Sequence, residues 1–302
     1  MRATVRVPAS VANLGPGFDI LALALQLQNE VTAQTTDDGA VTIDIDGDAA
    51  DAQLRDPAHN LVTRAYVESC ARLNVPEHER GVHLRCVNAI PVARGLGSSA
   101  AATLSGVLVA VALHRAPWDE RDILDCAAGF EGHMDNLAAS LFGGLAICAP
   151  GALVQRIDVP DELHAIVFAP LERLATQQAR QAVPEQFSRD DAVFNASRCA
   201  LLIRALTLGD YAALREAMDD RWHQPQRAAL FPPMAPLIEA AYAGGADGAC
   251  LAGAGPSILA LCAHDPATVE DGLRSAAARL DVPGTVLRLR PRNFGARVEV
   301  RA

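Results

Sequence analysis

PVARGLGSSAAAT, residues 91–103, joins an alternating apolar run at 82–86 to an Ala-rich segment that extends to Leu113. This pattern predicts a strand, a glycine loop and the start of a helix. Because glycine has no Cβ, Gly95 and Gly97 allow the loop backbone to adopt positive φ and to turn its N–H groups toward a ligand. The first turn of the following helix adds unpaired N–H donors and the positive end of the helix dipole. The stretch is therefore predicted to bind an anion, and phosphate is the best match.

Two serines follow the glycines and bear on what the loop could bind. The hydroxyls of Ser98 and Ser99 could supply ligand oxygens to a Mg²⁺ ion that accompanies a nucleotide. A turn with a serine N-cap is the simpler interpretation, but the paired glycines, the paired serines and the small residues 100–102 occur together. The stretch lacks the Gly-Lys-Ser/Thr end of a Walker A loop and the third glycine of a dinucleotide fingerprint. It therefore predicts a phosphate loop of another kind.

Length and composition indicate two domains. The chain has 302 residues, enough for two hydrophobic cores, and we expect the domains to be residues 1–150 and 151–302, divided near two Gly-rich turns. Half of the residues are hydrophobic and only 4% are aromatic, so the cores must be built from Ala, Val, Leu and Ile. The net charge of −10 argues against a nucleic-acid partner, so any anion site must be local.

Cysteine usage and hydropathy indicate where the protein works. The seven cysteines are scattered and show no C-x-x-C spacing, so we expect buried thiols rather than disulfides or a zinc site. The first ten residues lack the apolar segment and cleavage site of a signal peptide. The apolar run 100–113 is shorter than the ~20 residues that a bilayer span needs. We therefore expect a soluble, cytoplasmic protein with no membrane partner.

The N-terminal region contains a turn that carries polar side chains. Alternation over Thr4–Val7 predicts a strand that ends at Pro8. ASVANLGPGFD, residues 9–19, follows, and its Gly-Pro-Gly sequence predicts a turn that holds Asn13 and Asp19.

Local patterns predict further elements along the first half. Residues 31–35 and 41–45 alternate around an Asp-Gly pair, which predicts a β-hairpin. Asn60 is placed to cap a helix, because apolar residues follow it at helical spacing. The segments 100–113 and 118–130 are predicted to be helices, the second capped by Asp119.

A second polar cluster, EGHMDN at 131–136, lies between apolar segments. A helix end with capping residues explains one or two of its side chains, but it does not readily explain Glu131 and Asp135 together. Phosphoryl transfer gives both a role, because one carboxylate could hold Mg²⁺ against the β- and γ-phosphates and the other could orient the attacking hydroxyl.

The second half predicts alternating strands and helices. Thr176 and Arg180 are four residues apart, so on a helix they could point the same way. Two apolar strands flank a glycine turn at 253–256. Other predicted elements are a strand at 163–168, helices at 190–208, 211–218, 236–243 and 266–280, and a strand at 285–289. These elements would complete a second α+β layer.

Residues 91–101 resemble the ATP loop of the GHMP small-molecule kinases, the family of galactokinase, homoserine kinase and mevalonate kinase. They match the pattern P-x-x-x-G-L-G-S-S-A at every fixed position. Residues 9–19 and 131–136 resemble the A-x-S-A-N-L-G-P-G-F-D and E-G-H-P-D-N motifs of the homoserine kinases in that family, with Val11 in place of Ser and Met134 in place of Pro. Residues 251–257 resemble L-S-G-A-G-P-T, with Ala252 in place of Ser.

This resemblance implies an α+β, two-domain GHMP kinase fold. It implies an N-terminal ATP-binding domain like domain 2 of ribosomal protein S5, and a ferredoxin-like C-terminal domain that contributes substrate residues. ATP and Mg²⁺ would be the cofactors, and a homodimer is usual among relatives, although no patch in the sequence shows one. The implied ATP-binding residues are Asn60, Pro91, Val92, Ala93, Arg94, Gly95, Leu96, Gly97, Ser98, Ser99, Ala100 and Ala101.

The resemblance also implies an activity, namely ATP-dependent phosphorylation of the L-homoserine side-chain hydroxyl in threonine biosynthesis. Ser98, Ser99 and Glu131 would face the metal, and the implied catalytic residues are Glu131, His133, Asp135 and Asn136. The implied substrate residues are Asn13, Asp19, His133, Asp135, Thr176, Arg180 and Arg227. Two guanidinium groups suit an α-carboxylate, and Asn13 with Asp19 suits an α-ammonium.

Two alternatives stay open. A kinase of this family could act on another small alcohol such as mevalonate or pantoate, but those molecules lack the ammonium group that Asn13 and Asp19 would bind. A catalytically inactive regulator with the same fold is the other alternative. The presence of Glu131, Asp135 and the whole glycine loop argues against it.

Overall fold

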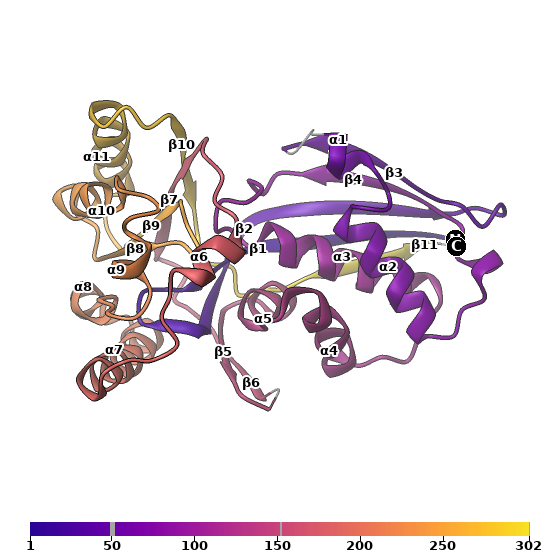
Figure 1. Ribbon diagram of the computed structural model, residues 1–302, viewed down its shortest axis with the longest axis horizontal. Helices are drawn as coiled ribbons and strands as arrows, with labels where there is room; N and C mark the ends of the chain where they lie inside the picture. The colour runs from indigo at the N-terminus through magenta and orange to yellow at the C-terminus, as the bar shows by residue number, and fades with distance from the viewer. Residues whose placement is uncertain (49–51, 152, 302) are drawn as a thin grey trace.

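The computed structural model describes residues 1–48, 52–151 and 153–301. Within these residues the strands form two sheets, one of seven strands and one of four. The larger sheet and its helices occupy one end of an elongated molecule, and the smaller sheet and its helices occupy the other (Figure 1). The predicted phosphate loop therefore lies in the half that contains the larger sheet, and Arg180 and Arg227 lie in the half that contains the smaller sheet.

The larger sheet has a central path of strands in the order β11-β1-β2-β4-β3, and a β5–β6 hairpin attaches to β2. Its bounds are β1 Arg2–Asn13, β2 Gly17–Thr35, β3 Val41–Gly47, β4 Val82–Asn88, β5 Leu145–Ala149, β6 Leu153–Ile157 and β11 Arg297–Arg301. All neighbouring pairs are antiparallel except β3 and β4, which are parallel. Buried apolar residues of β1 and β2 pack in the first core together with residues of β4, α2, α3 and α4.

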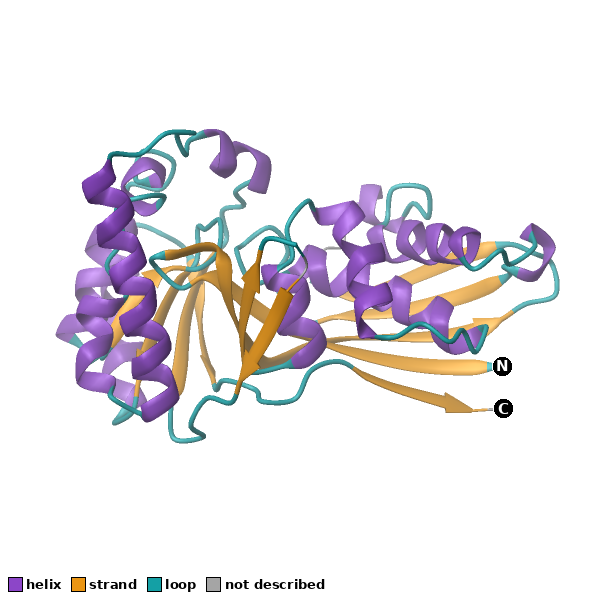
Figure 2. Cartoon of the chain, turned by 90° about the horizontal axis from the view of Figure 1, so that it is seen from below, coloured by secondary structure: helices purple, strands orange, loops and turns teal. Residues whose placement is uncertain are grey.

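Helices cover one face of this sheet (Figure 2). They are α1 Ala52–Arg55, α2 Leu61–Arg72, α3 Ser98–Leu113, α4 Glu120–Glu131 and α5 Asp135–Phe142, with a 3₁₀ turn, η1, at Glu77–Glu79. The α3 helix is apolar on all sides and lies buried between β1 and α2. A Cβ at Gly106 of α3 would lie 2.2 Å from the Val62 carbonyl oxygen of α2, so glycine allows the two helices to approach closely.

The smaller sheet has the antiparallel order β10-β7-β9-β8. Its bounds are β7 His164–Pro170, β8 Gly248–Leu251, β9 Ile258–Cys262 and β10 Gly284–Leu289. The second core forms where α10 and α11 pack on this sheet. The helices of this half are α6 Thr176–Gln181, α7 Arg189–Leu208, α8 Leu214–Ala217, α9 Gln224–Arg227, α10 Met234–Ala243 and α11 Pro266–Arg279, with a 3₁₀ turn, η2, at Tyr211–Ala213.

Many of the predicted elements are confirmed. Asn60 caps α2 by accepting a hydrogen bond from the Val62 N–H, and Asp119 forms a capping box at the start of α4. The helix predicted at 190–208 is α7, which ends at Gly209 in the left-handed conformation. The seven cysteines, all within the described part of the chain, are free thiols, and all except the half-buried Cys199 are buried.

The predicted hairpin of 31–35 with 41–45 is wrong. Strand β4 lies between the two segments, antiparallel to β2 and parallel to β3. The alternating residues Val82, Leu84 and Cys86 are buried, so β4 supplies an apolar partner to both segments. Local alternation identifies strands but does not reveal which strands become neighbours.

The predicted end of the first strand at Pro8 is also wrong. Strand β1 continues through Pro8 to Asn13 and stays paired with β2. The register shifts between Pro8 and Ala9, which is how a strand accommodates a residue that has no N–H to donate.

The two sheets do not divide at residue 150. Strand β6 follows that residue, and β11 returns from the end of the chain to pair with β1, and both lie in the larger sheet. Figure 2 accordingly shows the two termini side by side. The boundary at 150 between the two expected domains stays a prediction.

Candidate active site

One cavity lies where the two halves of the molecule meet, and it gathers most of the residues that the sequence singled out. The glycine loop, the end of β1, the start of β2, the 131–136 cluster, α6, α9 and the glycine turn after β8 all contribute to its wall. The lining residues are Ala12, Asn13, Phe18, Asp19, Ala93, Arg94, Gly95, Gly97, Ser98, Ser99, Ala100, Glu131, His133, Asp135, Asn136, Thr176, Arg180, Arg227, Gly253 and Ala254.

The glycine loop is held in a conformation that few other residues would allow. Gly97 has φ of +70° and precedes the first turn of α3. That first turn borders the cavity, so its unpaired N–H groups lie at the cavity wall. Gly95 has φ of +75°, and a Cβ there would lie 2.0 Å from the Ala252 carbonyl oxygen. The loop therefore packs directly against the glycine turn of the smaller sheet.

A carboxylate with hydroxyl partners stands beside the loop. Ser99 donates its hydroxyl to both oxygens of Glu131, and Thr103 donates to Oε1 at 3.2 Å. Glu131 ends α4, and Ser99 and Thr103 lie one turn apart on α3, so two helices bring the three side chains together. The result is a cluster of oxygen atoms at the end of α3.

His133, Asp135 and Asn136 form a polar group next to Glu131, in which Asp135 is buried and the other two are half-buried. The Nδ1 of His133 lies 2.7 Å from Oδ1 of Asp135, and the Asn136 N–H donates to the same oxygen at 2.7 Å. Burial lowers the pKa of His133, but the hydrogen bond and negative charge of Asp135 outweigh it, so the net pKa is raised. Ser10 donates to Oδ1 of Asn136 at 2.9 Å and fixes its amide.

Also in the cavity wall, Asp19 and Arg180 are paired with each other. The Arg180 guanidinium donates to both Asp19 oxygens, at 2.6 and 2.9 Å, and this contact joins α6 to the start of β2. The hydrogen bond from Arg180 to Asp19 raises the pKa of Arg180. Asn13 lies next to them, accepting from the Asp19 N–H at 3.2 Å and donating to the Gly253 carbonyl at 2.8 Å.

The second arginine is buried, with only 2% of its surface exposed. Arg227 donates from Nε to the Ala179 carbonyl and from Nη1 to the Gly253 carbonyl, each at 3.0 Å. Burial and the nearby charge of Arg180 lower the pKa of Arg227 to about 10, so it stays cationic at neutral pH. The ring of Phe18 lies 5.5 Å from Arg227 and 5.7 Å from Arg180, within cation–π range of both.

Some predicted residues lie outside the cavity wall. Asn60 uses its amide to cap α2 and to donate to the Leu54 carbonyl. Leu96 and Ala101 are buried in the first core. Pro91 and Val92 lie in the loop before the glycines, where the Val92 N–H donates to Asp48.

The roles of several residues in the site could not be predicted from the sequence. Phe18 lies inside a recognised motif, yet an aromatic residue there is equally typical of a core position. Ser10 and Thr103 reach the cluster from buried faces of β1 and α3, and only the packing of those elements reveals their roles. A buried network around Asp220 and His223 supports Arg227, as described below.

Two negative findings concern the described residues only. Across 1–48, 52–151 and 153–301, no group of three or more His, Cys, Asp or Glu side chains is arranged to hold a metal ion. Among the helices of those ranges, none combines the length and apolarity that crossing a membrane requires.

The fold and the cavity together define a phosphotransferase that acts on small molecules, and comparison with known families agrees. Residues 60–144 match the family model described as GHMP kinases N terminal domain, and residues 202–279 match GHMP kinases C terminal. The chain therefore belongs to the GHMP kinases, which use ATP as phosphate donor and an alcohol as acceptor.

Among the relatives of this chain are homoserine kinases. The homoserine kinase of Moorella thermoacetica is 36% identical over 97% of this chain and 98% of its own length. That of Microchaete diplosiphon is 37% identical over 97% and 96%. The crystal structure of homoserine kinase from Cytophaga hutchinsonii is similar with a TM-score of 0.89 and 28% identity, over 99% of this chain and 97% of that one.

Proposed function

We propose that this protein transfers the γ-phosphoryl group of ATP to the side-chain hydroxyl of L-homoserine, giving O-phospho-L-homoserine and ADP in threonine biosynthesis. The observation that carries the proposal is one cavity whose wall combines two arginines and an aspartate with the glycine loop and Glu131. The similarity to homoserine kinases over nearly the whole chain supports the same substrate.

The glycine-loop end of the cavity suits the nucleotide. The backbone N–H groups at residues 95–101 and the positive end of the α3 dipole would bind the phosphates. Glu131, Ser98 and Ser99 would hold Mg²⁺, which prefers oxygen ligands and usually takes only one or two carboxylates from the protein, together with substrate phosphates. The oxygen cluster of Glu131 with Ser99 and Thr103 fits that donor set. The bound ion would neutralise charge on the transferred phosphoryl group.

The opposite end suits a zwitterion. Arg180 and Arg227 would bind the α-carboxylate, and Asp19 with Asn13 would bind the α-ammonium. Thr176, one helical turn before Arg180, would contact the same substrate. Arg180 and Asp19 neutralise each other, and an amino acid would offer each of them an opposite charge in place of its present partner.

Asp135, His133 and Asn136 lie between the two ends and would orient the hydroxyl toward the γ-phosphate. The Oδ1 atom of Asp135 is fixed by the His133 ring and the Asn136 N–H, so the carboxylate is held in one orientation. Because phosphoryl transfer passes through a loose transition state, positioning contributes more than proton removal. Asp135 acts either as a base or only as an orienting group, and both roles require it at this place.

An ADP-release assay with Mg-ATP tests the proposal. Homoserine, threonine, mevalonate, pantoate and galactose are compared at equal concentrations, and we expect a clear preference for homoserine in kcat/KM. A preference for mevalonate or pantoate would overturn it in favour of another alcohol kinase. Absence of turnover on every alcohol would favour an inactive regulator. The cytoplasmic location and a homodimer stay predictions.

A further inference from the structure

Arg227 stands on an element that cannot position it alone. Its helix, α9, spans only four residues, Gln224–Arg227, and such a short helix is marginal without tertiary support. The guanidinium is nevertheless fixed by contacts on several sides, including the carbonyls of Ala179 and Gly253. A third contact, from Nη1 to the Nδ1 atom of His223 at 3.1 Å, comes from the residue just before the helix.

The proton arrangement of His223 follows from its neighbours. Its Nε2 atom lies 2.7 Å from the Gly15 carbonyl oxygen, which can only accept, so Nε2 carries the proton. The other nitrogen, Nδ1, is then free to accept from Arg227, which can only donate. The side chain has no exposed surface, and burial lowers its pKa to about 4, so the ring is neutral at physiological pH. The neutral ring thus links Gly15, in the turn that leads into β2 and Asp19, to Arg227.

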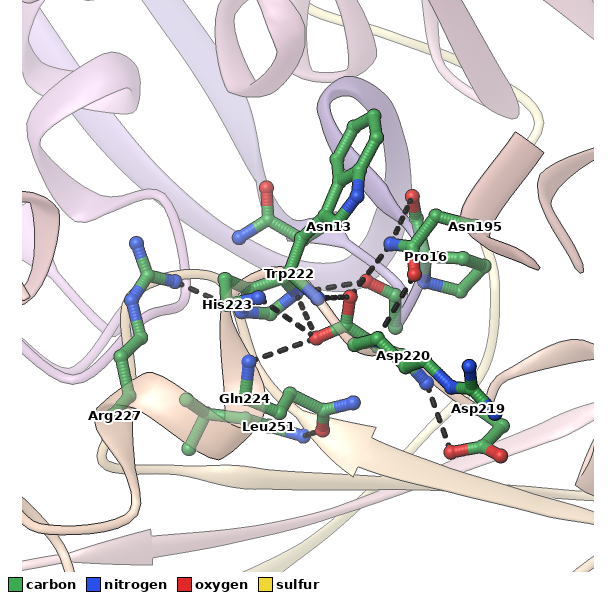
Figure 3. Close-up of polar contacts among 12 residues, drawn as sticks. Asn13, Pro16, Asn195, Asp219, Asp220, Trp222, His223, Gln224, Arg227 and Leu251 are labelled. Atoms are coloured by element: carbon green, nitrogen blue, oxygen red, sulfur yellow. Dashed lines mark hydrogen bonds and ion pairs between the residues drawn. The ribbon is translucent and has the colours of Figure 1, made fainter. Parts of the chain in front are cut away.

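A buried carboxylate holds the backbone on which His223 stands. Asp220 accepts hydrogen bonds from the N–H groups of Trp222, His223 and Gln224, at 2.8, 3.1 and 2.7 Å. The amide of Asn195, on α7, donates to the same carboxylate at 2.7 Å. Figure 3 shows His223 between Asp220 and Arg227, with these bonds converging on the turn before α9. Asp220 therefore fixes the start of the helix and the place of the ring.

Since Arg227 is the proposed carboxylate ligand, we infer that His223, held in place by Asp220, is a positioning residue. It aims the Arg227 guanidinium at the substrate carboxylate and ties it to the Gly15 turn that leads into Asp19. This inference rests on the proposed function. It explains why a neutral, singly oriented ring stands beside a cation: a protonated ring would turn an N–H toward the N–H of Arg227.

Two amide variants separate the two hydrogen bonds. His223→Gln places an amide nitrogen near the position of Nε2 and keeps the bond to Gly15, but it loses the acceptor for Arg227. His223→Asn places an amide oxygen near the position of Nδ1 and keeps that acceptor, but it loses the bond to Gly15. For H223Q we expect a rise of about tenfold or more in KM for homoserine, since a hydrogen bond to a charged group is lost. For H223N we expect a smaller rise, and for both an unchanged KM for ATP.

The Arg227→Ala background distinguishes positioning from a general structural role. If His223 acts through Arg227, H223Q adds no further rise in KM for homoserine once Arg227 is absent. The inference is overturned if H223Q leaves that KM unchanged, raises both KM values equally, or keeps its full effect in the R227A background. The wild-type enzyme is assayed first, so absence of homoserine turnover overturns the proposed function, whereas normal turnover with an unaffected H223Q overturns only the role of His223.

A measurement on the wild-type protein needs no variant to fold. We expect ¹⁵N NMR to show a neutral His223 ring with its proton on Nε2 at neutral pH. A proton on Nδ1, or a charged ring, would overturn the inference because neither form can accept from Arg227.

Discussion

Replacing Asp19 by Asn tests how the Asp19–Arg180 pair selects a zwitterion. The carboxylate of Asp19 holds Arg180 through two hydrogen bonds, so any substrate that needs Arg180 must first open this pair. Homoserine offsets the free-energy cost of separating Arg180 from Asp19, because its ammonium takes the place of Arg180 beside Asp19. The des-amino analogue keeps the carboxylate and the hydroxyl but leaves Asp19 without a partner. The Asp19–Arg180 pair should therefore exclude the analogue from the wild-type enzyme.

Asp19→Asn should lower kcat/KM for homoserine and raise kcat/KM for the des-amino analogue. A hydrogen bond to a charged group contributes about 1.5–3 kcal/mol, and solvent screening at side chains that are 36% and 37% exposed reduces this to about 1–2 kcal/mol. Homoserine should lose about 5- to 30-fold in kcat/KM, and the analogue should gain by a similar factor because Arg180 is free. The preference for homoserine should thus fall by roughly 30- to 1,000-fold. Asp19 has φ of +58°, a conformation that Asn tolerates well, so the backbone is not disturbed.

The assay is ADP release at saturating Mg-ATP, with homoserine and the des-amino analogue titrated separately. Asp210→Asn is the matched control, since Asp210 pairs with Arg204 at the surface and leaves the preference unaltered. The decisive result is kcat/KM of the D19N variant for the des-amino analogue. If D19N weakens homoserine but does not improve the analogue, Asp19 binds the ammonium without competing for Arg180, and the exchange of partners described above is refuted.

Three further outcomes follow from the geometry. Asp135→Asn should lower kcat and leave KM for ATP nearly unchanged, and unchanged turnover would remove Asp135 from the mechanism. NMR titration of the same variant should show a lower pKa for His133, because the negative charge of Asp135 is gone. Gly95→Ala should lower Tm and ATP affinity much more than Gly151→Ala, because both have positive φ but only Gly95 places its Cβ against backbone. The folded pKa of His223, about 4, lies below its ordinary 6.5, so the stability that it contributes is present above pH 6.5 and is lost as pH falls toward 4. The free energy of unfolding in urea should depend less on pH across that range in His223→Gln than in the wild-type protein. An equal dependence on pH in the two proteins would contradict the buried neutral ring.

Features that depend on neighbouring residues in sequence could be predicted. Glycines at 95 and 97 determine a loop by their own conformational freedom, and Asp119 caps a helix two or three residues away. Thr176 and Arg180 lie one helical turn apart, and the structure places both in the cavity wall. The motif residues came together because each motif lies at the end of a strand or helix that meets the same cleft.

Features that depend on distant partners could not be predicted. The placement of β4 between β2 and β3 is decided by packing across the sheet rather than by the turn at 36–40. The sequence around His223 is typical of an exposed polar loop, and its burial follows only when the Gly15 turn docks beside α9. The pairing of Asp19 with Arg180 likewise needs both halves of the chain.

The return of β11 to the first strand has a consequence for protein engineering. The smaller sheet and its helices form an excursion between β6 and β11, so this half is inserted within the other rather than appended to it. A chimera that takes the substrate-side half from a different kinase of this fold would need two junctions, one shortly after Ile157 and one between Leu289 and Arg297. The second junction would have to preserve the bridge between Leu25 and Pro291, which anchors the returning chain to β2. The first would have to preserve the hydrogen bonds of Val159 with Asn293.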